Sequence, residues 1–266
     1  MSQLTHASVS RQQKVFYAAV GLLAAWVGAW GLVAPAYVDW ALPWIVPPLH
    51  ARFLGAMYVS GATFMLGAIL ARHWSAIRVI VPMISIWTGT LLLVSLLYLP
   101  AFDFTHHQVW IWFAAYLIYP VIAAIIAWRK RTSADHGTGP AVPQALKQYL
   151  LAQGVLVTLL ALVLLFLPQV GASLWPWPIT PLLTQLYGAP FLAYGLGSLY
   201  ATRQAAKSDL TLFLLGTAVF TATVLAASII HLALFSFNAP ASWLWFAGFG
   251  LATLILVLSA GHSLRT

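Results

Sequence analysis

The chain of 266 residues contains no cysteine and no glutamate, and only 6% of its residues are charged. The absence of thiols excludes disulfides, thiolate-held iron–sulfur clusters and covalently attached c-type haem. Soluble domains carry about 25% charged residues. A chain that is 62% hydrophobic and so poor in charge is therefore predicted to be an integral membrane protein.

Acidic residues are nearly as scarce as thiols. The chain has four aspartates, and each lies near the end of an apolar run rather than inside one: Asp39, Asp103, Asp135 and Asp209. A proton pump or an ion-coupled transporter normally needs an ionisable group within a membrane span. The placement of the aspartates argues against both classes.

Basic residues dominate the charge, which has a formal net value of +8. The 12 lysines and arginines fall in short loops between apolar runs, and all except Arg52 map to one membrane surface. The positive-inside rule then predicts that both termini are cytoplasmic, and we expect the cytoplasmic (inner) membrane of a bacterium. Because topology accounts for the charge, we expect membrane lipids as partners and no nucleic acid.

A helix needs about 20 apolar residues to cross ~30 Å of hydrocarbon. We therefore predict an all-α, polytopic membrane protein with about eight transmembrane helices. The predicted spans are 15–34, 51–71, 76–99, 108–128, 148–167, 186–203, 208–235 and 243–262.

Residues that are rare in such an apolar chain recur at a constant offset in the numbering (176 − 43 = 133). The Pro-Trp pair at 43–44 returns at 176–177, and Gly55 returns as Gly188. With four spans per copy, both copies have the same orientation, so we predict two parallel four-helix repeats related by a pseudo-twofold axis along the membrane normal. The predicted organisation is a cytoplasmic segment 1–13, a first repeat 14–128, a linker 129–146 and a second repeat 147–266.

Each predicted unit has a first helix that ends in proline, then a proline-rich outer stretch. In the first copy the second helix opens with Arg52-Phe53-Leu54-Gly55, whereas Gln185 occupies the arginine position of the second copy. This pattern resembles DoxX-like small membrane proteins. The resemblance implies a membrane protein, sometimes an accessory subunit of a quinone-linked oxidoreductase, and it assigns no functional residue here.

Polar residues of the first repeat gather near its outer surface, where the second repeat has mostly apolar or small residues. One hypothesis is a metal site, because imidazole and carboxylate suit Zn, Cu, Fe or Ni, with Asp103, His106 and His107 as ligands. The other is a local ion pair of Arg52 with an aspartate beside solvated histidines. The candidate cluster consists of Asp39, His50, Arg52, Asp103, His106 and His107.

Two further sites use aromatic or imidazole side chains. His50 and His231 could ligate a b-type haem if the second and seventh spans meet across the pseudo-twofold. Tryptophans at the outer ends of spans fit an aromatic belt at the headgroup level, and alternatively a site for an apolar ligand such as a quinone, carotenoid or other isoprenoid. The candidate tryptophans are Trp44, Trp110, Trp112, Trp177, Trp243 and Trp245.

The leading hypothesis is a non-catalytic scaffold or accessory subunit, or a binder of an apolar lipid-like molecule, with other membrane subunits or that molecule as partner. No phosphate loop, His-Glu-x-x-His or Gly-x-Ser-x-Gly motif occurs, so we expect no enzyme and no cofactor. The alternative is a membrane oxidoreductase or a metal- or haem-binding subunit that uses the outer cluster. A third hypothesis is a facilitator of neutral solutes, with a path near Thr88, Thr90, Thr221 and Thr223.

Overall fold

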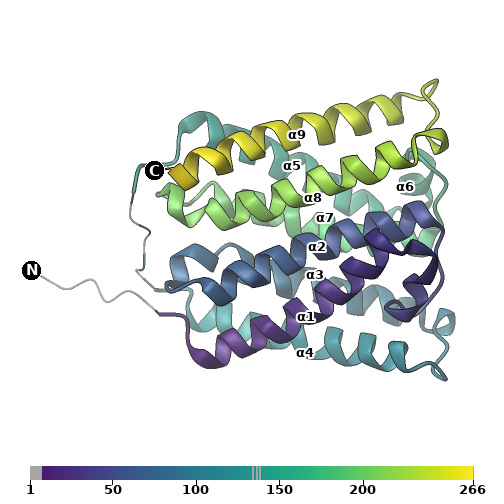
Figure 1. Ribbon diagram of the computed structural model, residues 1–266, viewed down its shortest axis with the longest axis horizontal. Coiled ribbons are helices and arrows are strands. Elements are labelled where there is room, and N and C mark those ends of the chain that lie inside the picture. Colours follow the sequence, from purple (N-terminus) through teal and green to yellow (C-terminus); the bar gives the residue numbers. More distant parts are fainter. Residues whose placement is uncertain (1–7, 134, 136, 138, 266) are drawn as a thin grey trace, which may run out of the picture.

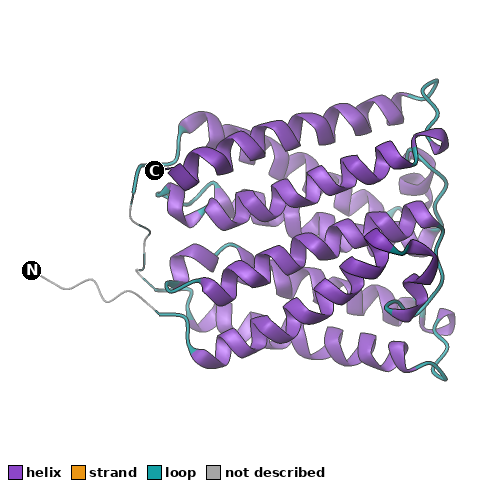
Figure 2. Ribbon diagram, viewed as in Figure 1, coloured by secondary structure: helices purple, strands orange, loops and turns teal. Residues whose placement is uncertain are grey.

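The computed structural model describes residues 8–133, 135, 137 and 139–265, with side chains up to residue 261. The described part consists of helices and loops, and two isolated bridges are its sole β-type pairings (Figure 2). The all-helical fold is therefore confirmed. The α-helices are α1 Arg11–Val33, α2 Pro48–Leu70, α3 Ile80–Leu97, α4 His107–Arg129, α5 Gln144–Phe166, α6 Pro168–Leu174, α7 Pro181–Ala201, α8 Thr211–Ile230 and α9 Pro240–Arg265. Short 3-10 helices connect them: η1 Pro35–Trp40, η2 Trp74–Ile77, η3 Leu99–Ala101, η4 Lys207–Asp209 and η5 Leu232–Leu234.

Seven helices within the described residues are long and apolar enough to cross a membrane: α1, α2, α3 together with η2, α4, α5, α8 and α9. The remaining predicted span, 186–203, corresponds to α7. This helix has the necessary length, 21 residues, but it contains Gln185 and several tyrosines and glycines, and its apolar character is lower. Most of α7 is buried among other helices, so its side chains meet protein rather than lipid.

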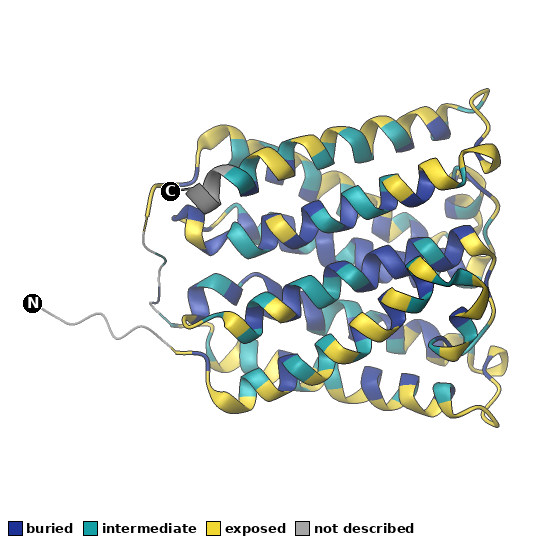
Figure 3. Ribbon diagram, in the orientation of Figure 1, coloured by how far each residue is buried: buried dark blue, intermediate teal, exposed yellow. Residues whose placement is uncertain are grey.

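The long helices lie side by side, and α1 begins at the end of the molecule where α9 finishes (Figure 1). Half or more of the residues in the central parts of α2, α3 and α8 are buried, against a third or less in α1, α4, α5 and α9. Figure 3 shows the exposed residues along the outer helices. The architecture is therefore an inner group of α2, α3, α7 and α8 flanked by four outer helices that carry a lipid-facing apolar surface.

Contacts between helices follow one scheme in both parts of the chain. Helix α1 packs on α2 and α3 packs on α4, while α5 packs on α7 and α8 packs on α9. Across the middle, α2 packs mainly on α8 and α3 mainly on α7. The inner helices of one part thus find their principal inner partners in the other part.

Ser60, in the middle of α2, joins three of the inner helices. Its hydroxyl donates to the carbonyl of Gly216 in α8 at 2.6 Å and accepts from the Tyr194 hydroxyl of α7 at 2.5 Å. All three groups would be costly to bury unpaired in an apolar interior. The bonds therefore fix α2 against α7 and α8.

Several contacts occur twice, and the two occurrences are separated by the offset found in the sequence (245 − 112 = 133). The indole of Trp112 donates to Ser95 at 2.9 Å, and that of Trp245 donates to Ser228 at 2.9 Å. The same offset relates the backbone bond from Val9 to the Arg72 carbonyl at 3.1 Å to that from Val142 to the Ala205 carbonyl at 2.9 Å. Each part of the chain therefore has the same local tie between its entering segment and the end of its second long helix. The indoles of Trp110 and Trp243 likewise donate to the carbonyls of Phe104 and Phe237.

Helices α1 and α2 approach so closely that glycine is required at their crossing. A Cβ atom on Gly31 would lie 2.6 Å from the Ala51 carbonyl oxygen and 2.8 Å from the Cα of Gly55. Both neighbours are backbone atoms, which cannot rotate away. Small residues at such crossings let transmembrane helices gain close packing in lipid.

Substitution Gly31→Ala tests this crossing. We expect it to lower the free energy of unfolding by about 1–3 kcal/mol, the usual cost of overpacking. The matched control is Gly248→Ala in α9, where a Cβ atom meets nothing within 4 Å and stability should be unchanged or higher. Reversible unfolding in mixed micelles measures both, and equal effects of the two substitutions would contradict the packing assigned to Gly31.

Candidate functional site

His50 lies in the first turn of α2, where it is buried between the two parts of the chain. Its Nδ1 is 2.7 Å from the hydroxyl of Tyr187 in α7, and its ring makes an edge contact with Trp177 at a centroid distance of 6.2 Å. His50 is therefore part of the packing between α2 and α7 rather than a residue of the outer loops.

Arg52 pairs with a histidine and not with an aspartate. One of its terminal nitrogens is 2.6 Å from Nε2 of His231, the residue that directly follows α8. The packing of α2 on α8 brings the two together, so the expected ion pair of Arg52 with Asp39 or Asp103 is not the contact that the structure contains. Because Arg52 donates, Nε2 must be unprotonated. Burial and the nearby positive charge lower the pKa of His231.

The other outer residues bond within the first part of the chain. Asp103 accepts from the Thr105 amide at 2.9 Å and from the Thr105 hydroxyl at 2.7 Å, which lowers the pKa of its carboxyl group. His106 Nε2 lies 3.4 Å from the same carboxyl group, and both side chains are exposed. The backbone carbonyl of Asp39 accepts from Gln108 at 3.2 Å.

The predicted outer cluster is thus divided among several neighbourhoods. His50 and Arg52 contact residues of α7 and of the end of α8, Asp103 and His106 form a turn, and His107 begins α4. Among the described residues, no group of three or more histidines and aspartates is close enough to hold a metal ion. The geometry does not bring the proposed ligands Asp103, His106 and His107 into one metal centre.

Of the two predicted haem ligands, His50 lies in the first turn of α2 and His231 contacts Arg52 of the same helix. Helices α2 and α8 do meet, as two-sided ligation requires. However, Nδ1 of His50 bonds to the Tyr187 hydroxyl, and Nε2 of His231 accepts from Arg52. Both histidines therefore have protein partners across the boundary between the two parts.

The candidate tryptophans fall into two kinds. Trp110 and Trp243 are each 61% exposed at the outer ends of α4 and α9, as expected of an aromatic belt. Trp112 and Trp245 are buried, and they pack edge-on against Trp44 and Trp177 at centroid distances of 5.0 and 4.9 Å. These two indoles face the inside of the bundle, where they donate to Ser95 of α3 and to Ser228 of α8, so they do not contribute to an aromatic belt.

Three of the threonines predicted to line a solute path bond to their own helices. Thr88 donates to Ile84, Thr221 to Ala218 and Thr223 to Val219, at 2.6 to 3.2 Å. Such bonds to a preceding carbonyl satisfy the hydroxyl within the helix.

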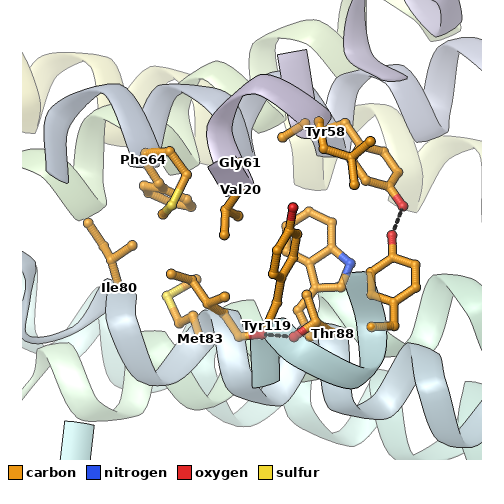
Figure 4. A pocket seen from close by; sticks show the side chains of 14 residues that line it. Val20, Tyr58, Gly61, Phe64, Ile80, Met83, Thr88 and Tyr119 are labelled. Carbon is orange, nitrogen blue, oxygen red and sulfur yellow. Dashed lines mark hydrogen bonds between the residues drawn. The ribbon is translucent and has the colours of Figure 1, made fainter. Parts of the chain in front are cut away.

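A cavity of about 60 Å³ lies between α1 and α2 on one side and α3 and α4 on the other. Figure 4 shows it between Val20 and Phe64 on one side and Ile80 and Met83 on the other. Its walls are almost entirely apolar. The polar groups along them are the indole of Trp87, the hydroxyl of Thr88, which donates to the Ile84 carbonyl of its own helix, and the hydroxyls of three tyrosines.

Three tyrosines supply those hydroxyls. Tyr58 of α2 and Tyr116 of α4 are bonded to each other through a short contact between their hydroxyls. Tyr119, one turn further along α4, donates across to the carbonyl of Ala19 in α1 at 3.4 Å. The cavity therefore combines an apolar interior with a small polar group at its edge, the usual composition of a small-molecule site.

Packed aromatic side chains stand at the corresponding positions of the second part of the chain. Tyr194 stands at the position of Gly61, and its ring stacks on Phe220 at a centroid distance of 4.6 Å. Phe249, which stands at the position of Tyr116, packs on Phe220 in turn. At Gly61 an added Cβ atom would meet only Ala24 at 3.8 Å and Trp87 at 4.0 Å. A comparison of Gly61 with Tyr194, the residue 133 positions later, would have pointed to the cavity.

A second space continues from the cavity toward the outer surface. It has a volume of about 230 Å³ between α1 and α4, and it shares Leu23 and Tyr116 with the cavity. His107 and Trp40 lie at its outer end. The seam between α1 and α4 is thus the open side of the first part.

No protein-family model, curated protein or solved structure matches this chain. The likeness to DoxX-like proteins therefore depends on the short Arg52-x-x-Gly55 pattern and its proline-rich setting alone.

The bond between Arg52 and His231 predicts a pH dependence. Because the pKa of His231 is lowered from its ordinary value of 6.5 in the folded state, the unfolded chain takes up this proton first as the pH falls. The stability associated with neutral His231 is thus complete above about pH 6.5 and is lost as the pH falls through the lowered pKa.

The test compares the wild type with His231→Gln, whose carbonyl oxygen can still accept from Arg52 but does not titrate. Between about pH 7 and pH 5, the melting temperature of the wild type should fall further than that of the variant. Both proteins contain His50, so its contribution to the pH dependence of the melting temperature cancels in the comparison. Parallel pH profiles would show that His231 does not contribute in this way.

Proposed function

We propose that the chain consists of two parallel four-helix repeats, with α1–α4 and α5–α9 as the copies. The contacts that recur at the constant offset support this, as do the matching pairs of helices. The ties at Val9 and Val142 extend each copy a few residues before the boundaries expected from sequence. The end that carries the basic loops is proposed to face the cytoplasm, so that both termini lie there.

We further propose that the protein binds an apolar lipid-like molecule in the cavity of the first repeat, as a non-catalytic binding or accessory subunit of a bacterial inner membrane. The observation that carries this proposal is the open space at Gly61, a position at which the other copy has Tyr194 stacked on Phe220. A scaffold alone would gain stability by filling it, since cavities in a packed core cost free energy.

The dimensions restrict what can bind. A cavity of about 60 Å³ is smaller than the ~150 Å³ cavity that holds benzene in an engineered protein. It therefore accepts one end of a ligand, and the remainder lies in the adjoining space of about 230 Å³ along the α1/α4 seam. The tyrosine hydroxyls offer one hydrogen bond, which suits a mostly apolar molecule with one weakly polar group, such as a quinone or another isoprenoid.

The substitution Gly61→Phe tests this by filling the cavity from within. Protein purified from its native membranes should carry a lipid-soluble molecule, and Gly61→Phe should reduce its amount at least about tenfold because an occupied pocket cannot admit a ligand. Mass spectrometry of the solvent extract measures the bound molecule.

Two controls accompany it. Gly61→Ala adds a Cβ atom in ordinary contact distance and should retain the ligand. Leu66→Phe adds a ring on the lipid-exposed side of the same helix and should also retain it. A wild-type protein without any bound lipid-soluble molecule, or a folded Gly61→Phe variant with an undiminished amount, would contradict the proposed function.

A further inference from the structure

A groove of about 520 Å³ lies at the other end of the α1/α4 seam, between the start of α1 and the end of α4. We call it the basic groove, because Arg129 and Lys130 form its outer rim together with Gln13. Its inner wall, toward the middle of the helices, is apolar and includes Phe16, Ile122 and Ile125. The groove therefore changes from basic to apolar along the helix axis, as a phospholipid changes from headgroup to chain.

The charges on the rim have no partner in the described part of the protein. No aspartate lines the groove, and neither Arg129 nor Lys130 forms an ion pair with another described residue. The neighbouring Arg131 is held elsewhere, with its guanidinium 3.6 Å from the ring centroid of Trp128 and a bond to the Trp128 carbonyl at 3.0 Å. Two adjacent cations are thus left for an external anion.

A polar donor of the rim is also uncommitted. The carboxamide oxygen of Gln13 accepts from the Ser10 amide at 2.9 Å in the capping box that begins α1. This bond fixes the side chain and leaves its NH₂ group, which can only donate, without a partner among the described residues. The rim of the groove therefore combines a hydrogen-bond donor, the Gln13 NH₂ group, with the cations of Arg129 and Lys130, and no described carboxylate accepts from any of them.

We infer that the basic groove binds one anionic phospholipid, with its phosphate at Arg129 and Lys130 and an acyl chain along Phe16, Ile122 and Ile125. Guanidinium groups bind phosphate with matched geometry. Basic residues at the end of a membrane helix attract anionic headgroups. A soluble anion would satisfy the charges but would leave the apolar wall exposed.

The site belongs to the first copy. On the proposed repeat, His262 and Ser263 stand at the positions of Arg129 and Lys130, and Leu146 stands at that of Gln13. The second copy therefore lacks the two permanent cations and the donor. The α1/α4 seam of the first copy thus carries a candidate binding site at each end, the space beside the cavity and the basic groove. The second copy lacks the residues of the basic groove.

The groove is separate from the cavity of the first repeat. The ring of Phe16 meets that of Tyr119 edge-on at a centroid distance of 5.9 Å, and this contact closes the seam between the two spaces. Loss of lipid from the basic groove should consequently leave the ligand of the cavity in place. Loss of that ligand should likewise leave the lipid in the basic groove.

The experiment compares two double variants with the same change in charge. The protein is incorporated into membranes of equal parts phosphatidylglycerol and phosphatidylcholine, and native mass spectrometry counts the lipids retained after release. The wild type should retain one phosphatidylglycerol at least about tenfold over phosphatidylcholine. The Arg129→Gln/Lys130→Gln variant should lose this preference, whereas Arg72→Gln/Arg203→Gln, at exposed positions of the same membrane face, should keep it.

A third variant, Ile125→Trp, retains both charges and fills the apolar wall, so it should also lose the bound lipid. Equal loss in the two double variants would mean diffuse surface attraction and would overturn the inference. Retention by Ile125→Trp, or full displacement by inorganic phosphate, would mean an anion site without a lipid chain and would overturn it as well. Equal retention of phosphatidylglycerol and phosphatidylcholine by the wild type would also overturn the inference.

Discussion

Helices within a bilayer gain little by burying apolar surface, because lipid is as apolar as the helix itself. Their association depends on close contact and on the pairing of polar groups that have no water to bond. In this protein both requirements meet at α2. Gly55 admits the backbone of α1 on one side, and Ser60 bonds to α7 and α8 on the other. The positions of the outer helices and of the cavity beside α2 follow from that central helix.

The same constraint explains which elements the sequence could predict. Seven of the predicted spans are evident from their apolar composition, and these include the inner helices α2, α3 and α8 as well as the four outer helices. Helix α7 faces protein over most of its surface, and its Gln185 bonds to the Leu165 carbonyl at 2.6 Å. Its polar and small residues are paired or packed within the protein, so this helix is less apolar than the seven others although the sequence still predicts it as a span.

Site residues were harder to predict, because their partners come from distant parts of the chain. The sequence places His50 and Arg52 at the start of the second predicted helix, but it does not show their partners, because Tyr187 and His231 approach them only after α2 has packed on α7 and α8. Asp103, by contrast, accepts a hydrogen bond from Thr105, which is only two positions later in the chain, and such a local contact can be expected from the sequence. The cavity left no motif, since it consists of a missing side chain at Gly61; only comparison with Tyr194 makes that absence visible.

The exchange of inner partners, α2 with α8 and α3 with α7, has a consequence for biogenesis. Helices enter the membrane in chain order, so α2 arrives before any residue that will bond to His50 or Ser60 has been synthesised. Until then these polar groups lie in lipid or against temporary neighbours. Because the partners of His50 and Ser60 belong to the same chain, the encounter is intramolecular and depends on the insertion of α7 and α8 rather than on a second molecule.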